Sequence, residues 1–506
     1  MMDTLLMHSD DDTALALRDL PAGHVVVVDG RSITLRQPVP CGHKIALRAI
    51  ARGEQVRKYG QPIGRATADI TPGEHVHTHN LESLRGRGDL ASSDQAAIRP
   101  IAQVPHVADT HSPVVVGAPS VSVFGGYRRK DGRVGVRNHV LVLATVGCAN
   151  AVVDHIGQKL PEVVSVSHVY GCSQIGDDLA QSRRVLQEFA MHPNVGAVLL
   201  VGLGCETMPT AEIAEQLAGR GVVVQKLIIQ DEGGSRATAA RGLDIARELL
   251  QQVSSAERDP IPLSELIVGV ECGGSDAWSG ITANPAVGAA SDLVVQVGGT
   301  VMLSEVTEFI GAEHFIAARA INPRVGQQVV DATLRREQEA GRMGVDMRGS
   351  QPTPGNMAGG LTTIEEKSLG AILKGGSTPV REFVPYARRP TQHGLVVMDT
   401  PGNDIESVTA MVAGGAQVVV FTTGRGSPTG CPIAPVIKVA TNSVMYRRLR
   451  DDMDVDAGTI LSAGEPVASV GQRVFDEIVA AANGKQTSAE AWGHKEFAIS
   501  AIGPRL

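Results

Sequence analysis

A repeated pattern of apolar run, glycine turn and helical stretch constrains the fold of this chain more than any other feature. It is clearest at 266–288, where the run LIVGV is followed by Glu271, Cys272 and a Gly-Gly-Ser-Asp turn. An apolar run of this length bounded by glycine predicts a buried strand. The pattern also occurs upstream, at 139–148, 163–172 and 195–206. Strand, turn and helix in repetition predict a parallel sheet with right-handed crossovers.

The strand pattern also divides the chain into predicted domains. Residues 12–85 contain short strand-like runs separated by glycine and proline turns, which predicts a small β domain. Residues 86–118 are rich in Arg, Gly, Ser, Asp and Pro and lack periodicity, as expected of a linker. We therefore predict an α/β protein in which two α/β domains with mainly parallel sheets, 119–255 and 256–506, follow the β domain and its linker.

The composition excludes several classes of protein. The 506 residues include 46 Lys plus Arg against 54 Asp plus Glu, a net charge of −8, and 3% aromatic residues. An acidic chain with few aromatic rings offers no surface suited to nucleic acid. No apolar run reaches the roughly 18 to 20 residues of a membrane span, and the start MMDTLLMHSDDD lacks the basic region of a signal peptide. We expect a cytoplasmic protein that binds neither nucleic acid nor membrane.

Four of the six cysteines follow predicted strands: Cys148, Cys172, Cys205 and Cys272. The carboxyl ends of neighbouring parallel strands meet at one edge of a sheet, where ligands bind. The four thiols can therefore hold an iron–sulfur cluster or flank a mononuclear iron. Alternatively, the turns only require a small buried residue, a role that cysteine often has. The cysteines have no C-x-x-C spacing, which argues against a zinc knuckle.

The N-terminal β domain ends in a second candidate site. In the segment HVHTHN, His75, His77 and His79 alternate, so that a strand would place all three on one face. Imidazoles at this spacing can converge on one divalent metal, with Asn80 nearby. A solvated histidine face is the alternative. His43 and Lys58 are weaker candidates for the same surface.

The loop at 422–427, after the run VVVF, combines hydroxyls, glycines and one arginine. Backbone amides, hydroxyls and a guanidinium together suit a carboxylate or phosphate. The loop lacks the GxxxxGK[ST] pattern of a P-loop, and no G-x-G-x-x-G opens the α/β region. Nicotinamide binding is therefore not supported.

These segments together resemble the altronate/galactarate dehydratase family of sugar-acid hydro-lyases. The resemblance spans nearly the whole chain and includes the motifs GRVGVRN, YGCSQ, GLGCE, ECGGSDAWSGITANPAVG, SEVTE, TPGNMAGGL, EEKSLG and FTTGRGSPTGCP. It implies that the N-terminal module is a SAF-like domain of the β-clip type. It also implies a small-molecule substrate and dependence on Fe²⁺ or Mn²⁺.

The resemblance implies removal of water from a hexonic or hexaric acid to give a 2-keto-3-deoxy acid. The form HVHTHN looks more like the altronate branch than the galactarate branch, so altronate is the first expectation and galactarate the next. A sulfolactate sulfo-lyase shares the architecture, which leaves a different leaving group as an alternative. A non-catalytic sugar-acid-binding protein is the third possibility. We also expect a homo-oligomer, and an exposed N-terminal module offers a surface that can pack on a neighbouring subunit.

Such a dehydration requires a base for the proton beside the carboxylate, an acid for the leaving hydroxyl, and a metal that stabilises the dianion. The acid, base and metal-ligand candidates are His77, His79, Glu206, Glu271, Glu308 and Lys367. The candidates for holding the carboxylate and hydroxyls are Arg137, Asn138, Ser275, Asp276, Asn284, Thr423, Arg425 and Ser427.

Overall fold

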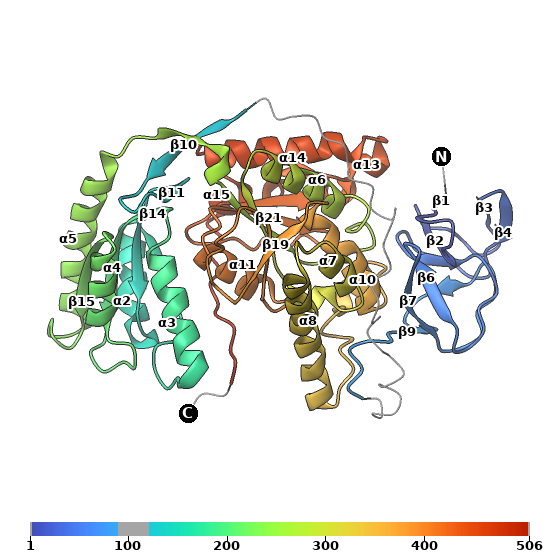
Figure 1. Ribbon diagram of the computed structural model, residues 1–506, viewed down its shortest axis with the longest axis horizontal. Helices are drawn as coiled ribbons and strands as arrows, with labels where there is room; N and C mark the ends of the chain where they lie inside the picture. Colours follow the sequence, from blue (N-terminus) through green and yellow to red (C-terminus); the bar gives the residue numbers. More distant parts are fainter. Residues whose placement is uncertain (1–2, 90–120, 504–506) are drawn as a thin grey trace.

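The computed structural model describes residues 3–89 and 121–503. An N-terminal antiparallel β region lies at one end, a four-stranded α/β unit lies at the other, and a seven-stranded α/β unit lies between them (Figure 1). The predicted fold class is therefore confirmed. Most of the predicted linker, from 90 to 118, lies outside the described residues, and the predicted domain boundaries stay predictions.

The N-terminal region consists of three small antiparallel sheets. The first contains β1 (Thr4–Leu5), β2 (Thr13–Ala16), β5 (Lys44–Ala46) and β8 (His75–Val76). The second contains β6 (Gln55–Lys58), β7 (Gln61–Ala66) and β9 (Leu81–Glu82), and the third is the hairpin of β3 (Val25–Val28) and β4 (Arg31–Thr34). Alternate residues of β3 and β6 are buried, as expected of strands with one face on a core.

The four-stranded unit is a parallel sheet in the order β13-β12-β14-β15. Its strands are β12 (His139–Ala144), β13 (Val164–Val166), β14 (Val195–Gly202) and β15 (Val223–Ile228). Helices α2 (Asn150–Lys159) and α5 (Ser235–Ser254) share a core with one face of the sheet, and α3 (Gly176–Ala190) and α4 (Thr210–Gly219) with the other. Side chains of β12 alternate between the two cores, as the period of two requires.

A small antiparallel sheet connects this unit to the central one. It contains β10 (Val123–Arg128), β11 (Val134–Gly135) and β16 (Asp259–Pro262).

The central unit is a seven-stranded sheet in the order β19-β20-β18-β17-β21-β22-β23, and all its pairings are parallel. The strands are β17 (Ile267–Cys272), β18 (Thr300–Leu303), β19 (Val380–Val384), β20 (Gly394–Met398), β21 (Val418–Thr423), β22 (Val436–Ala440) and β23 (Val455–Asp456). The chain builds the sheet outward from β17 to β19 and β20, and then returns to the other side of β17 with β21. The gap between β17 and β21 is therefore a switch point, where open α/β sheets bind ligands.

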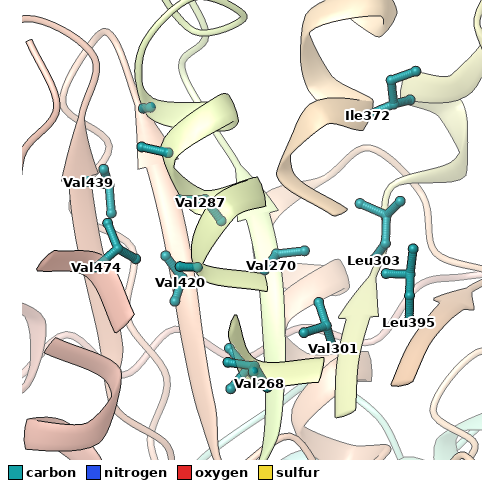
Figure 2. Close-up of a cluster of buried hydrophobic side chains, with 14 of the residues drawn as sticks. Val268, Val270, Val287, Val301, Leu303, Ile372, Leu395, Val420, Val439 and Val474 are labelled. Atoms are coloured by element: carbon teal, nitrogen blue, oxygen red, sulfur yellow. The ribbon is translucent and has the colours of Figure 1, made fainter. Parts of the chain in front are cut away.

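Apolar side chains cover both faces of the central sheet. Figure 2 shows Val270 and Val420, from β17 and β21, beside Val287 of α6 (Ala283–Gln296) and Val474 of α14 (Val467–Ala482). The other face packs on α11 (Asp404–Ala413). The remaining helices are α7 (Glu313–Ala318), α8 (Pro323–Met343), α9 (Pro354–Ala358), α10 (Ile364–Ala371), α12 (Ser443–Arg448), α13 (Thr459–Ser462) and α15 (Ser488–Trp492). None of the described helices is long and apolar enough to cross a membrane.

A buried ion-pair triad joins the N-terminal region to the central unit. Lys44 Nζ and Lys58 Nζ each lie 2.8 Å from one oxygen of Glu366 on α10. All three side chains are at most 1% exposed. The contact between the two units is therefore specified by charge as well as by apolar packing.

Candidate active site

The ends of β17 and β18 place buried ionisable side chains at the centre of the seven-stranded sheet. Cys272, the last residue of β17, donates from Sγ to Glu308 Oε2 at 3.0 Å. Lys374 Nζ lies 2.9 Å from the same sulfur and 2.6 Å from Glu305 Oε2. Lys367 Nζ donates to Glu308 Oε1 at 2.6 Å. These five side chains, each at most 5% exposed, form one hydrogen-bonded network.

The carboxyl groups of Glu271 and Glu305 lie close together beside this network. Among the described residues, no nitrogen or hydroxyl donates to Glu271 Oε1 or Glu305 Oε1, which are both buried, and the carboxyl of Glu271 hydrogen-bonds to that of Glu305. Glu271 Oε2, in contrast, accepts from Ser304 and Ser407 at 2.9 and 2.7 Å. Burial, followed by the neighbouring charge of Glu305, raises the pKa of Glu271 well above its usual range. A cation beside these oxygens would favour the ionised form of both carboxyls, because a nearby positive charge lowers the pKa of a carboxyl group.

Two groups of side chains in this region could hold that cation. One is Cys272, Glu305 and Glu308, and the other is Glu271, Glu305 and Asp404; in each, the ligand atoms lie within 4.8 Å of one another. The groups share Glu305. Carboxylate oxygens, alone or together with the thiolate of Cys272, are ligands that suit a divalent metal such as iron or manganese.

A cavity of about 580 Å³ opens beside the network. Lys367, Asp404, Gln351 and Asn356 line it, and Lys367 Nζ also donates to Gln351 Oε1 at 2.6 Å. Burial, helped by the charges of nearby glutamates, raises the pKa of Asp404 to about 7. A group that titrates near neutral pH can both take and give a proton. The volume is in the range of small-molecule sites.

The turn after β17 meets the loop after β21. Gly424 N and Arg425 N both donate to Gly274 O, at 3.1 and 2.9 Å. Gly274 has φ +59°, and a Cβ there would lie 2.9 Å from Ser427 Oγ, so this approach requires glycine. Most of the predicted substrate-binding residues lie in or beside these two loops: Ser275, Asp276, Asn284, Thr423, Arg425 and Ser427. Their roles stay predictions.

The histidines of the N-terminal region form a separate group. Strand β8 ends at Val76, and a turn follows instead of the predicted continuous strand. His43, His75 and His77 have ring nitrogens within 4.8 Å of one another, whereas His79 contacts only the ring of His75 among them. Burial lowers the pKa of His75 and of His77 to about 3, so both rings are neutral at neutral pH. Neutral imidazoles can coordinate a metal.

Comparisons with known proteins identify the family of this chain. The model "Altronate/galactarate dehydratase SAF domain" matches residues 2–84, "D-galactarate dehydratase/Altronate hydrolase, second domain" matches 126–254, and "D-galactarate/Altronate dehydratase, C-terminal" matches 263–505. The altronate dehydratase of Escherichia coli is 38% identical over 100% of both chains. The chain belongs to the altronate/galactarate dehydratase family. It is accordingly a hydro-lyase of the altronate/galactarate dehydratase type.

Two further relatives of this hydro-lyase differ in their reactions. The galactarate dehydratase (L-threo-forming) of Escherichia coli is 35% identical over 97% of this chain and 95% of its own. The (2R)-sulfolactate sulfo-lyase subunit beta of Chromohalobacter salexigens is 37% identical over 75% of this chain and 97% of its own.

Several residues predicted for the site of this family member lie elsewhere. Arg137 pairs with Glu490 at 2.8 Å and donates to the carbonyl of Ala481, and Asn138 donates to Val253 O. Glu206 lies at the edge of the four-stranded sheet, where it accepts from Thr210. The three other strand-end cysteines, Cys148, Cys172 and Cys205, belong to that sheet as well.

Sequence reasoning did not single out three residues of the site. Asp404 follows β20 in the segment MDTPGND, a polar turn after an apolar run, which is the signal that could have identified it. Gln351 and Lys374 lie in glycine-rich segments that carry no such signal. Only the packing of residues 351–375 against the ends of β17 and β18 brings them to Cys272, Glu305 and Glu308.

Proposed function

We propose that this hydro-lyase removes water from a hexonic or hexaric acid to give a 2-keto-3-deoxy acid, with altronate as the first candidate and galactarate as the next. One observation supports the proposal most. At the switch point of the central sheet, a buried network of carboxylates, a thiol and lysines opens onto a cavity of about 580 Å³ lined by Lys367 and Asp404. Such a site offers both proton transfer and anion binding beside a candidate metal position.

We propose Fe²⁺ or Mn²⁺ as the metal and Glu271 and Glu305 as two of its ligands, with Asp404 beside them as an acid/base group. Glu271 Oε1 and Glu305 Oε1 support this choice, because no nitrogen or hydroxyl donates to either and their carboxyls lie close together. When bound, a divalent ion acts as a Lewis acid and lowers the energy of the negative charge that develops beside a carboxylate. His77 with its neighbours His43 and His75 is the alternative ligand group.

The proton transfers are assigned to two side chains that line the cavity. Asp404, with a pKa of about 7, is suited to accept the proton next to the carboxylate. The ammonium of Lys367 is suited to protonate the leaving hydroxyl, because Glu308 keeps its pKa raised and therefore keeps it charged. Gln351 orients that ammonium by accepting from it. The side chains of Arg425 and Ser427 are the groups of the 423–427 loop suited to the distal hydroxyls of the substrate, because the loop amides already donate to Gly274 O and Thr423 Oγ1.

A sulfo-lyase reaction is the second candidate, because the subunit beta relative matches three quarters of this chain. Removal of sulfite instead of water would use the same base. It would depend less on the acid, since sulfite leaves without a proton. The two candidates therefore differ in how strongly turnover depends on Lys367.

The test is an anaerobic assay of the full chain loaded with iron. Altronate, galactarate and (2R)-sulfolactate are supplied separately, and 2-keto acid and sulfite are measured. We expect 2-keto acid from altronate, and its loss in Asp404→Asn. Asp399→Asn is the matched control, because Asp399 lies on the same segment but pairs with Arg335 outside the cavity. Absence of product from all three acids would refute the proposal, and sulfite release alone would favour the second candidate.

A further inference from the structure

Three Gly-Cys dipeptides lie at the carboxyl edge of the four-stranded sheet, outside the site described above. Cys148 follows β12, Cys172 lies in the loop after β13, and Cys205 follows β14. These three strands are neighbours in the order β13-β12-β14. All three thiols are free and exposed. Cys272, by contrast, is buried in the other sheet between Glu308 and Lys374.

Hydrogen bonds hold the three thiol-bearing loops against one another. Gly147 N donates to Tyr170 O at 3.0 Å, which joins the first loop to the second. Thr207 N donates to Gly171 O at 3.1 Å, which joins the second loop to the third. Cys172 therefore belongs to the middle of three adjoining loops, with Cys148 and Cys205 on the loops at its sides.

The backbone conformation favours glycine before two of the thiols, and the contact is close before the third. Gly171 has φ +98° and a Cβ there would overlap Thr145 O, and Gly204 has φ +120° and a Cβ there would lie 2.5 Å from Gln230 Oε1. A Cβ on Gly147 would lie 3.1 Å from His168 O. Close packing therefore fixes the backbone immediately before each cysteine.

The surroundings favour negative charge at the first of these thiols. Helix α2 begins two residues after Cys148, and it has neither a side-chain cap nor an acidic residue in its first turn. A helix N-terminus stabilises an anion. Thiolates and the sulfides of a metal cluster are such anions.

The separation of the thiols argues against a single ion shared by all three. Within the part of the chain that the structure describes, the ligand groups with atoms inside 4.8 Å of one another do not include these three cysteines. A single ion needs its ligands that close together, whereas a cubane cluster binds each thiolate at a separate iron and so spreads the sulfurs apart. We propose that Cys148, Cys172 and Cys205 bind a [4Fe–4S] cluster, whose fourth iron is left without a protein ligand.

The test uses the full chain, purified without oxygen, reconstituted with ferrous iron and sulfide, and then desalted. Iron and acid-labile sulfide are measured per chain for the wild type, for Cys148→Ser, Cys172→Ser and Cys205→Ser, and for the triple variant. Cys41→Ser is the matched control, because Cys41 is also an exposed free cysteine but lies in the N-terminal region. Far-ultraviolet circular dichroism confirms that each variant is folded.

We expect about four irons and four sulfides per chain for the wild type and for Cys41→Ser. Each of the three single variants should fall to the sulfide content of the triple variant. Iron bound without sulfide, or sulfide retained equally in the triple variant, would overturn the proposal. Neither readout depends on turnover, so the result is independent of the proposed dehydration.

Discussion

The buried triad between the N-terminal region and the central unit allows a quantitative prediction. Replacing Glu366 with Gln leaves two lysine ammoniums, each at most 1% exposed, without the carboxylate that lies 2.8 Å from both. Breaking a buried pair by removing one partner costs about 3–5 kcal/mol. Burial already lowers the pKa of Lys44 to about 8, so this lysine can release its proton at little further cost. We therefore expect Glu366→Gln to lower the free energy of unfolding by an amount near the lower limit of this range, about 3 kcal/mol.

Trp278 provides the assay for this loss. It is 9% exposed and packs with Leu15 of the N-terminal region, whereas the other tryptophan of the chain, Trp492, is 64% exposed. Separation of the two units in urea should therefore change the fluorescence of Trp278 first. Glu54→Gln is the control, because Glu54 pairs with Arg48 at the surface and such pairs contribute about 0–1 kcal/mol. If the urea midpoint of the Trp278 transition shifted no more in Glu366→Gln than in Glu54→Gln, the reasoning would be refuted.

The same triad predicts how this contact depends on pH. The neighbouring lysines hold the pKa of Glu366 near 2, below the ordinary value of 4.5, despite its burial. A carboxylate with a lowered pKa contributes stability above its unfolded pKa and loses it as the pH falls toward the folded value. The Trp278 transition of the wild type should therefore weaken between about pH 4.5 and pH 2. Glu366→Gln should lack this component, and an unchanged acid dependence in that variant would contradict the assignment.

Three further predictions concern the candidate active site. Asp404→Asn should lower turnover by about 10²-fold or more while the melting temperature stays near that of the wild type, since a general base contributes about 10²–10⁴-fold. Lys367→Met should lower water elimination by a similar factor, and equal turnover in this variant would exclude Lys367 as the acid. Glu271→Gln should fold normally, because burial raises the pKa of the Glu271 carboxyl and so favours a neutral group at this position. Fe²⁺ or Mn²⁺ should raise the melting temperature of the wild type but not that of this variant. At a metal concentration one hundred times the dissociation constant, binding stabilises the wild type by about 2.7 kcal/mol.

Much of the fold was predictable from local patterns. The run LIVGV became β17, and the alternating runs of the first 85 residues became short antiparallel strands. These patterns are informative because the side-chain period and the glycine turns act within a few residues of one another. The end of β17, with Cys272 and the glycine turn, was for the same reason recognisable as a candidate site.

The partners of that strand end were decided by tertiary structure. Lys367 and Lys374 come from about a hundred residues farther along the chain, and nothing near them in sequence indicates that they contact Glu308 and Cys272. The strand order, which no local pattern encodes, also assigned Cys172 and its two neighbouring thiols to a different sheet from Cys272. The proton affinity of Asp404 likewise depends on burial among other carboxylates. Sequence determines which segments become strands and turns, but long-range packing determines which of their ends meet, because burial and charge interactions arise only when distant segments come together.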